Sequence, residues 1–287
     1  MLQDETCFFL AFDFDKAEWL EDVRAVLDTC RRMNIPAALE RSRSGAGGHV
    51  WFFFEEAISA ALVRRLGAHI LTETMDHRPD ISLGSYDRLF PNQDTLPRGG
   101  FGNLIALPLQ KSARATENSV FIDNQGQPYP DQWAFLSSVE RISKACVEQA
   151  TRDAIRRGRV ISVRIASSEE DEETPWTFRP SREPKLPELN VPLPDRVDVV
   201  LGDQLYIAKE GLPAPLRNRL RLLAAFQNPE FYKAQAMRLS TYDKPRVIDC
   251  SEDHPQHLAL PRGCLDDVRG LLSDLKIKAE VCDERFL

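Results

Sequence analysis

The pattern of apolar and polar positions predicts alternating strands and helices in the first half of the chain. Residues 7–14 and 49–54 are short, almost wholly apolar runs, which is typical of buried strands. Residues 17–33 and 58–75 repeat apolar positions at helical spacing, and the first of these runs ends before Pro36. The same reasoning predicts strands at 37–40, 103–109 and 119–122, and a long helix at 133–157.

Beyond residue 165 the pattern changes twice. Residues 169–173 are an uninterrupted acidic run, and the dense series of prolines that follows is poorly tolerated in helices and central strands. We therefore predict an α/β (α+β) protein in three parts: a domain at 1–165, a linker at 166–195 and a smaller mixed region at 196–287. The last part is predicted to contain a strand-turn-strand at 197–207, helices at 215–226, 228–239 and 265–275, and strands at 246–250 and 279–282. Because the chain ends directly after the last of these strands, we expect the natural protein to continue.

Composition narrows the class of protein. With 43% hydrophobic and 28% charged residues among 287, the chain has the composition of a soluble globular protein of one or two domains. The formal net charge of −7 argues against a uniformly basic nucleic-acid binder but leaves room for a local basic groove. No apolar run approaches the roughly 20 residues of a membrane span. The six cysteines form no C-x-x-C pair, so we expect a cytoplasmic protein with no membrane partner.

Two aspartates stand at the end of the first predicted strand. Asp13 and Asp15 are two residues apart, so both side chains lie on one face of the strand while Phe12 and Phe14 face the core. Neighbouring carboxylates repel each other and are costly to bury, and a divalent cation resolves both problems. Hard oxygen ligands suit Mg²⁺ or Mn²⁺. The alternative is a strand that simply ends in solvent, with Lys16 as a nearby counter-charge.

A glycine-rich loop, Ser44-Gly45-Ala46-Gly47-Gly48-His49, leads into the second apolar strand. Glycines let backbone N–H groups approach an anion, and His49 stands where the loop becomes a strand, in a position to contact a phosphate. Arg41 and Arg43 precede the loop and could add charge-assisted bonds. The loop fits neither the Walker A pattern nor the dinucleotide fingerprint, so an ordinary tight turn is the alternative.

Taken together, these motifs resemble the catalytic domain of the archaeo-eukaryotic primase superfamily, which includes the primase-polymerases. The shared order is an Asp-Phe-Asp strand, a helix, a Ser-Gly-x-x-Gly-His loop that enters an apolar strand, and a later lone aspartate. Residues 39–54, 87–94 and 99–110 look closest to primases fused to helicases in mobile-element conflict systems of the TOTE type. The resemblance covers roughly residues 7–140, about half of the chain, and the combination is far more specific than any single motif.

The resemblance implies an RNA-recognition-like sheet packed on a second α/β unit, and a template-directed nucleotidyltransferase that acts as a primase, a DNA polymerase or both. It implies that two Mg²⁺ or Mn²⁺ ions are held by Asp13, Asp15 and a third carboxylate. Asp87 fits that third position best, with Asp94 as its rival and Asp80 as a weaker one. The residues that the resemblance implies for binding the NTP or dNTP are Ser44, Gly45, His49, Arg43, Arg88, Asn103 and Lys111.

The C-terminal region suggests partners. Residues 226–233 and 260–263 resemble the segment that precedes a superfamily 2 helicase core in such fusions, and basic and aromatic residues between 217 and 246 suit contacts to single-stranded or primer-template DNA. A helical bundle with solvated arginines explains the same composition. No Walker A motif is present, so we expect no ATP hydrolysis by this chain. The spacing of Cys250, His254, His257 and Cys264 matches no zinc pattern that we trust.

Two other functions compete with a primase-polymerase. The chain could be a non-catalytic nucleic-acid-binding module that serves an attached helicase, although a pure binder has no need of paired acids at a strand end. It could also be a metal-dependent nuclease, which would use the acids but not the Ser-Gly-x-x-Gly-His loop. The sequence leaves open whether ribo- or deoxynucleotides are preferred and whether synthesis starts without a primer or extends one. It also leaves open whether the template is DNA or RNA, and what the oligomeric state is.

Overall fold

The computed structural model describes residues 1–15, 17–78, 80–100, 102–157, 159–160, 189 and 191–285. The chain divides into two compact units. Unit 1 comprises Met1–Thr74, Ile81–Ile161 and Glu230–Pro245, and unit 2 comprises Met75–Asp80, Ser162–Pro229 and Arg246–Leu287. The predicted acidic run and almost all of the predicted linker lie outside the described residues. No helix in the described part of the chain combines the length and apolar character needed to cross a bilayer.

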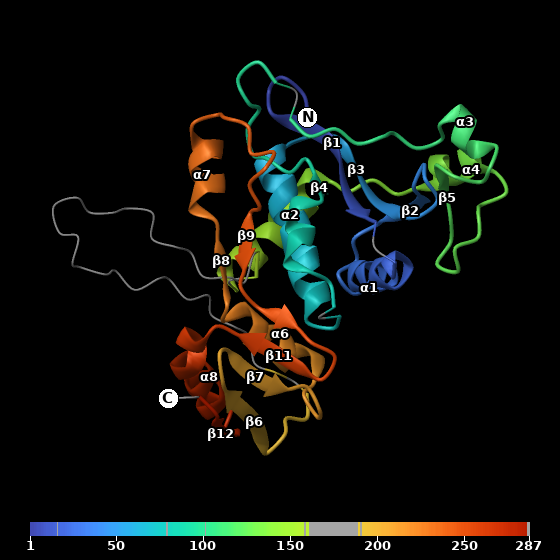
Figure 1. Cartoon of the computed structure of the whole chain (residues 1–287). Coiled ribbons are helices and arrows are strands. Elements are labelled where there is room, and N and C mark those ends of the chain that lie inside the picture. Colours follow the sequence, from blue (N-terminus) through green and yellow to red (C-terminus); the bar gives the residue numbers. More distant parts are fainter. Residues whose placement is uncertain are drawn as a thin grey trace. The chain divides into compact units, whose positions relative to one another are not determined.

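The centre of unit 1 is a five-stranded antiparallel sheet in the order β4-β1-β3-β2-β5 (Figure 1). Its strands are β1 (Thr6–Phe14), β2 (Ala38–Arg41), β3 (Gly48–Ser59), β4 (Leu89–Phe90) and β5 (Val120–Phe121). The predictions for residues 7–14, 37–40, 49–54 and 119–122 are therefore confirmed as strands, although β3 is longer than expected. The short β4 is an element that the apolar pattern did not reveal.

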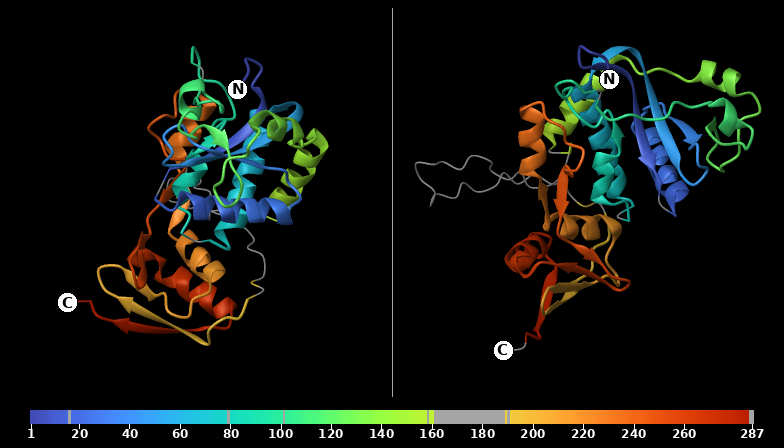
Figure 2. Two further views of the ribbon diagram at one scale, coloured as in Figure 1. Left: turned by 90° about the vertical axis from the view of Figure 1, so that its right-hand side faces the viewer. Right: turned by 45° about the horizontal axis from the view of Figure 1, so that its top comes forward.

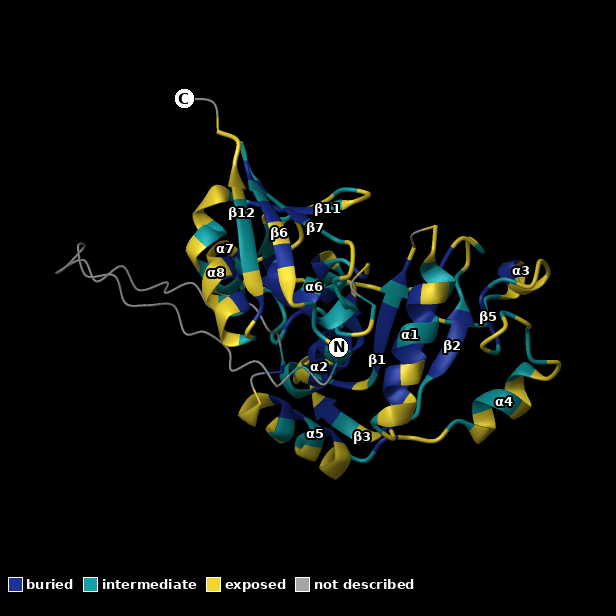
Figure 3. Cartoon of the chain, turned by 90° about the horizontal axis from the view of Figure 1, so that it is seen from below, coloured by how far each residue is buried: buried dark blue, intermediate teal, exposed yellow. Residues whose placement is uncertain are grey.

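Two helices cover one face of this sheet. α1 (Trp19–Arg32) and α2 (Ala60–Met75) confirm the predicted helices, and they pack on the face that carries Phe12 (Figure 2). The approach of α2 is close, because a Cβ on Gly67 would lie 3.1 Å from side-chain atoms of both Leu10 and Phe12. Figure 3 shows α1 lying along β1 and β2 with its exposed side turned outward. The apolar face of the sheet and the apolar face of each helix thus pack against each other.

The opposite face of the sheet carries a second cluster of buried residues, Ala11, Ala38, Trp51 and Phe121. Side chains from residues 105–139 cover it, including Tyr129 and Phe135, whose rings stack. The prediction of a strand at 103–109 is wrong. These residues pair with no strand, Leu104 and Leu107 are 78% and 61% exposed, and the apolar run that looked like a strand is an irregular cover. It ends at the short α3 (Lys111–Arg114).

The predicted long helix at 133–157 is also wrong, because it is two helices. α4 (Gln132–Ser138) begins at Asp131, whose side chain accepts hydrogen bonds from the N–H groups of Trp133 and Ala134. α5 (Lys144–Arg156) begins at Ser143. Between them Ile142 exchanges backbone hydrogen bonds with Phe53 and Glu55 of β3. Pairing with the middle of β3 therefore overrides the helical periodicity, as tertiary context often does.

A segment distant in sequence completes unit 1. Residues 230–245, which the sequence places in the C-terminal region, include most of α7 (Pro229–Ala236) and belong to unit 1. The Gln235 side chain accepts from the backbone N–H of Asp94 at 3.1 Å and donates to the Asp94 carboxylate at 3.2 Å. Arg238 forms an ion pair with Glu5 at 2.8 Å. Polar contacts of this kind require specific partners, which an apolar pattern does not encode.

Unit 2 is built on a second five-stranded sheet, in the order β10-β11-β7-β6-β12. Its strands are β6 (Arg196–Leu201), β7 (Leu205–Ala208), β10 (Glu252–Asp253), β11 (His257–Leu260) and β12 (Lys278–Asp283). α6 (Ala214–Leu222) and α8 (Leu265–Asp274) accompany this sheet, and β8 (Ala225–Gln227) and β9 (Val247–Asp249) form a small separate sheet. The predicted helix at 215–226 thus ends early, because its last residues are a strand. The strand β11 was not predicted.

Candidate active site at the end of the central strands

Strand register brings three polar side chains into one row across the sheet of unit 1. Asp13 of β1 lies opposite His49 of β3, and His49 lies opposite Glu40 of β2. Directly paired residues point to the same face, so the three side chains are neighbours. His49 Nε2 lies 3.6 Å from Asp13 Oδ1, and His49 Nδ1 lies 2.9 Å from Glu40 Oε2. The predicted Asp13 and His49 are therefore brought together.

Arg88 joins the two predicted metal-binding acids. Its Nη1 atom lies 3.1 Å from Asp13 Oδ2 and 2.8 Å from Asp15 Oδ2, so one nitrogen bridges both carboxylates. Partial burial alone lowers the pKa of the Arg88 guanidinium, but the charges of Asp15 and Asp13 outweigh it and hold that pKa above its usual range. The backbone assists, since Asp13 N–H donates to the Arg88 carbonyl at 3.0 Å. The two acids thus converge on a single positive charge.

A cavity of about 160 Å³ opens beside this ion pair. Its lining residues are Asp13, Phe14, Asp15, Asp22, Ser82, Gly84, Ser85 and Arg88. Pockets for whole small-molecule ligands usually measure about 300–1,000 Å³, so this cavity suits ions and a phosphoryl group better than an entire nucleotide. Its lining offers oxygen atoms from carboxylates and serine hydroxyls, which are the ligands that hard cations prefer.

The glycine-rich loop connects β2 and β3 and packs against the end of β1. A Cβ on Gly47 would lie 2.4 Å from the backbone oxygen of Phe14, so only glycine allows this approach. Gly45 has a φ of +79°, the left-handed conformation that also favours glycine. The predicted loop is therefore built into the same strand end as Asp13 and Asp15.

The remaining predicted nucleotide-binding residues are arranged less closely. Ser44 is exposed, and its hydroxyl lies 3.1 Å from that of Ser42 within the loop. Arg43 and Lys111 are exposed and do not line the cavity. Asn103 is held by backbone groups: its side chain donates to the Leu89 carbonyl at 2.9 Å and accepts from Asn92 N–H at 3.2 Å. In this conformation Asn103 supports β4 rather than facing the acids.

The candidates for a third carboxylate occupy different surroundings. Asp87 is half-buried at the end of a 3₁₀ helix, η1 (Leu83–Asp87), directly before Arg88. Both oxygens of Asp94 bond to the guanidinium of Arg64, at 2.5 and 2.9 Å. Asp80 belongs to unit 2, where Arg217 is 3.5 Å away. Among the described residues, no group of three His, Cys, Asp or Glu side chains is arranged to hold a metal ion, so none of these acids joins Asp13 and Asp15 in one cluster.

Sequence reasoning missed Glu40. This carboxylate is 1% exposed and accepts hydrogen bonds from His49, from Trp51 Nε1 at 2.7 Å and from the Ser119 hydroxyl at 3.1 Å. A signal was present in the sequence, since a hairpin that pairs Arg41 with Gly48 also pairs Glu40 with His49. Ser119, however, lies 79 residues from Glu40 in the chain, and no local pattern predicts that contact.

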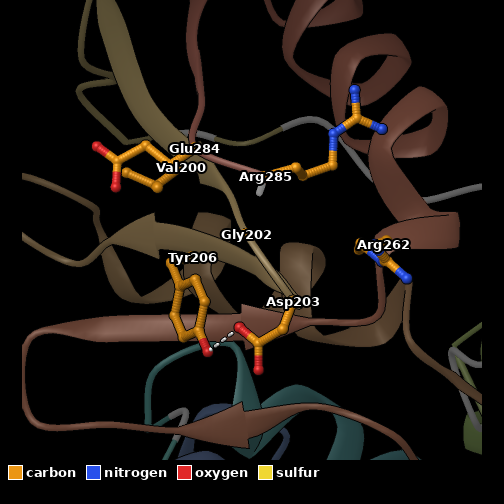
Figure 4. A pocket seen from close by; sticks show the side chains of 7 residues that line it. All are labelled: Val200, Gly202, Asp203, Tyr206, Arg262, Glu284 and Arg285. Atoms are coloured by element: carbon orange, nitrogen blue, oxygen red, sulfur yellow. Dashed lines mark hydrogen bonds between the residues drawn. The ribbon is translucent and has the colours of Figure 1, made fainter. Parts of the chain in front are cut away.

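A larger cavity, of about 540 Å³, lies in unit 2. Figure 4 shows its lining of Val200, Gly202, Asp203, Tyr206, Arg262, Glu284 and Arg285. Two of its charged lining residues are engaged with neighbours: the Tyr206 hydroxyl donates to Asp203 at 2.8 Å, and Arg285 forms an ion pair with Asp283 at 2.5 Å. No carboxylates converge on one point there, so the smaller cavity of unit 1 is the better candidate for an active site.

The fold defines a mixed α/β protein built on two five-stranded sheets. A family model described as the archaeo-eukaryotic primase domain of the TOTE conflict system matches residues 1–150. Because the match spans more than half of the 287 residues, the chain belongs to that family, as the resemblance predicted. No curated protein matches the chain. Family membership supports a primase-like nucleotidyltransferase, and the matched residues contain the whole Glu40–His49–Asp13–Arg88 row.

Proposed function

We propose that the chain is a template-directed nucleotidyltransferase, a primase, a DNA polymerase or both, whose active site is the strand end that carries Asp13 and Asp15. The observation that supports this most is the Arg88 bridge. Oxygens from two carboxylates converge on one cationic nitrogen, which is the arrangement that a divalent cation also requires. Arg88 thus marks a place where this chain stabilises positive charge.

The donor set fits Mg²⁺ or Mn²⁺. The side chain of Asp13 is 22% exposed and that of Asp15 is 53% exposed, so both are accessible from solvent. When bound, such ions would supply charge neutralisation at the triphosphate and activation of the attacking hydroxyl. Asp13 and Asp15 would hold the ions, and Arg88 would leave the carboxylates to make room. Once released, its guanidinium is suited to pair with a phosphate.

Other residues of the strand end bind and orient the nucleotide in this proposal. His49 presents Nε2 toward the side of Asp13, where a triphosphate oxygen would lie beside the cations. The backbone of the loop at Gly45 and the hydroxyl of Ser44 offer donors for the same anion. Arg43 and Lys111 are exposed and available for phosphate or template contacts. Phosphoryl transfer depends chiefly on such positioning and charge stabilisation.

We keep Asp87 as the proposed third carboxylate. It directly precedes Arg88, so a movement that frees the Asp13 and Asp15 carboxylates from Arg88 also moves the backbone of Asp87. Asp94 is a weaker candidate because its two oxygens are bonded to Arg64, whose side chain is only 7% exposed. Asp87→Asn should therefore lower nucleotide incorporation more than Asp94→Asn does, when both are corrected for the folded fraction.

The proposed substrates are NTPs or dNTPs and single-stranded or primer-template DNA, and the proposed partner is a fused or associated superfamily 2 helicase. A non-catalytic binding module and a metal-dependent nuclease are the alternatives. The converging carboxylates argue against a pure binding module, since a binder gains nothing from two acids held side by side. The loop packed on the strand end argues against a nuclease, because a nuclease needs no triphosphate-binding loop.

Extension of a labelled primer-template, and synthesis on an unprimed strand, test the proposal. Each reaction is run with NTPs or dNTPs and with Mg²⁺ or Mn²⁺. The wild-type chain should incorporate nucleotides, the variant with both Asp13→Ala and Asp15→Ala should not, and Asp203→Asn in unit 2 should retain activity. A wild type that incorporates nothing under any condition, or an active double variant, contradicts the proposal. Metal-dependent cleavage of the DNA that disappears in the double variant would identify the nuclease.

A further inference from the structure

Glu40 is a buried carboxylate whose oxygens lie within hydrogen-bond distance of three side chains, those of His49, Trp51 and Ser119. Glutamate is seldom buried this completely unless it is compensated, because an unpaired buried charge is costly. Here His49 and Trp51 both contact Oε2, and the Ser119 hydroxyl contacts Oε1. The two oxygens of a carboxylate have enough lone pairs to accept all three of these hydrogen bonds.

These contacts determine which nitrogen of His49 carries a proton. The indole N–H of Trp51 can only donate, so Glu40 Oε2 acts as an acceptor. His49 Nδ1, 2.9 Å from the same oxygen, must then bear the hydrogen that lies between them. The ring is held from behind by this bond and packs edge-on against Trp51 at a centroid distance of 6.0 Å. Its other nitrogen, Nε2, is left facing Asp13.

We propose that Glu40 is a positioning residue for the proposed nucleotidyl transfer: it accepts a hydrogen bond from His49 Nδ1–H and so fixes the imidazole ring with Nε2 turned toward the nucleotide site beside Asp13. The distance of 3.6 Å from Nε2 to Asp13 Oδ1 is too long for a good hydrogen bond, so Nε2 has no strong bond to give up when a ligand arrives. A carboxylate behind a ligand-binding histidine also fixes the ring orientation. This inference rests on the proposed function for its activity readout, but the protonation of Nδ1 can be tested without it.

The competing explanation is that the hydrogen bonds of Glu40 only stabilise the packing of the strands. Two control variants separate the explanations, because Trp51→Phe and Ser119→Ala each remove one hydrogen bond to Glu40 and leave the bond to His49 in place. Glu40→Gln tests the charge: its amide oxygen can accept from His49 and Trp51, and its NH₂ group can donate to Ser119. Glu40→Leu keeps a similar volume and removes every acceptor.

The first measurement is ¹⁵N NMR of the full chain with labelled histidine, in which His49→Gln assigns the His49 signals. We expect a protonated Nδ1 in the wild type, in Glu40→Gln and in both control variants, and a shift toward protonated Nε2 in Glu40→Leu. A wild type with an unprotonated Nδ1 overturns the proposal, and so does an unchanged ratio of ring forms in Glu40→Leu. This readout needs no catalysis, so it remains decisive if the proposed function fails.

The second measurement is primer extension, corrected for the folded fraction from thermal unfolding. Glu40→Leu should lower kcat by about 10- to 100-fold, the range expected when the group behind a ligating histidine is lost, and Glu40→Gln, which keeps an acceptor for His49, should lower it less. The KM for primer-template should stay within about threefold, since the template does not contact Glu40 in this proposal. The control variants should keep kcat within about threefold of the wild type. Equal losses of kcat in the controls and in Glu40→Leu would show that the role is merely structural.

Discussion

The two five-stranded sheets of this protein differ in what they bury at their strand ends. In unit 1 the face that carries Trp51 also carries the row of Glu40, His49 and Asp13, of which Glu40 is 1% exposed. In unit 2 apolar residues pack over β6, β7 and β11, and the buried charged residues Arg219 and Arg246 lie outside that five-stranded sheet. Charged side chains at the ends of its strands, such as Arg285, are exposed. Burial of charge is costly and persists only where it is compensated, so the first sheet carries the candidate site and the second carries packing.

Polar side chains also behave differently within each sheet. In unit 1 the donors and acceptors around His49 come from four separate segments of the chain and meet at one strand end. In unit 2 the ion pairs nearest the cavity are local, as between Asp283 and Arg285, which are two residues apart. A local exposed pair contributes only about 0–1 kcal/mol and implies little about function. A buried network that joins distant segments is far harder to maintain without a purpose.

The largest expected effect concerns the paired carboxylates of unit 1, which distinguish its sheet from that of unit 2. Asp13→Asn removes one charge from the converging carboxylates and should lower nucleotide incorporation by at least about a hundredfold, because a catalytic metal contributes several kcal/mol to the transition state. Asp203→Asn removes one charge from the cavity of unit 2 and should leave incorporation within about twofold of the wild type. Steady-state primer extension by both variants checks this. Equal losses in the two variants would mean that unit 1 holds no special site.

A second prediction separates stability from binding. Leu205 is fully buried in the apolar core of unit 2, and Leu205→Ala should cost about 2–5 kcal/mol of unfolding free energy through the cavity it leaves. Because the variant leaves Asp13 and Asp15 intact, its affinity for Mn²⁺ should stay within about twofold of the wild type under conditions in which it is folded. Urea unfolding followed by circular dichroism, together with Mn²⁺ titration, measures both quantities. A large loss of Mn²⁺ affinity would show that the two sheets are not independent.

A third prediction concerns the Arg88 bridge. If the guanidinium occupies the position of a cation, Arg88→Gln should tighten Mn²⁺ binding by roughly two- to tenfold, since each exposed ion pair is worth about 0–1 kcal/mol. Nucleotide incorporation by the same variant should fall, because the released guanidinium is proposed to bind a phosphate. Calorimetric titration with Mn²⁺ alone checks the first part. Arg285→Gln in unit 2 is the control and should not change the affinity for Mn²⁺. Weaker Mn²⁺ binding by Arg88→Gln would contradict the idea that the Arg88 guanidinium occupies the position of a cation.

The smallest expected effect is a pH dependence that originates in unit 1. Burial lowers the pKa of His69 below its ordinary value of 6.5, although its hydrogen bond to the Arg159 carbonyl opposes this. Between the folded pKa and 6.5 the unfolded chain binds more protons, so the free energy of unfolding falls as the pH drops through this window. His69→Gln should flatten that slope. Urea unfolding at a series of pH values measures it, and an identical slope in wild type and His69→Gln would remove His69 as the cause.

Much of unit 1 follows from local pattern. The apolar run before Asp13 predicts β1, and the apolar spacing from Trp19 predicts α1. Strand alternation predicts that Asp13 and Asp15 share a face, but β1 ends at Phe14, and Arg88 is what joins the two acids. The failures arise where a segment's partner is distant. Residues 103–109 have the composition of a strand but only cover the face of Trp51, and the helical pattern of 133–157 is interrupted where Ile142 pairs with β3. An apolar pattern predicts that a residue is buried, but it does not predict which other residues pack against it.

The amino-acid sequence by itself predicted the paired acids, the glycine-rich loop that enters a strand and membership of the primase family, because these depend on residue types at short, set spacings. Only the tertiary structure decided that Glu40 bonds to His49, that Arg88 bridges Asp13 and Asp15, and that Asp94 is bonded to Arg64. The first pairing follows from the register of one hairpin. The other two join segments far apart in the chain, which no short window of sequence contains.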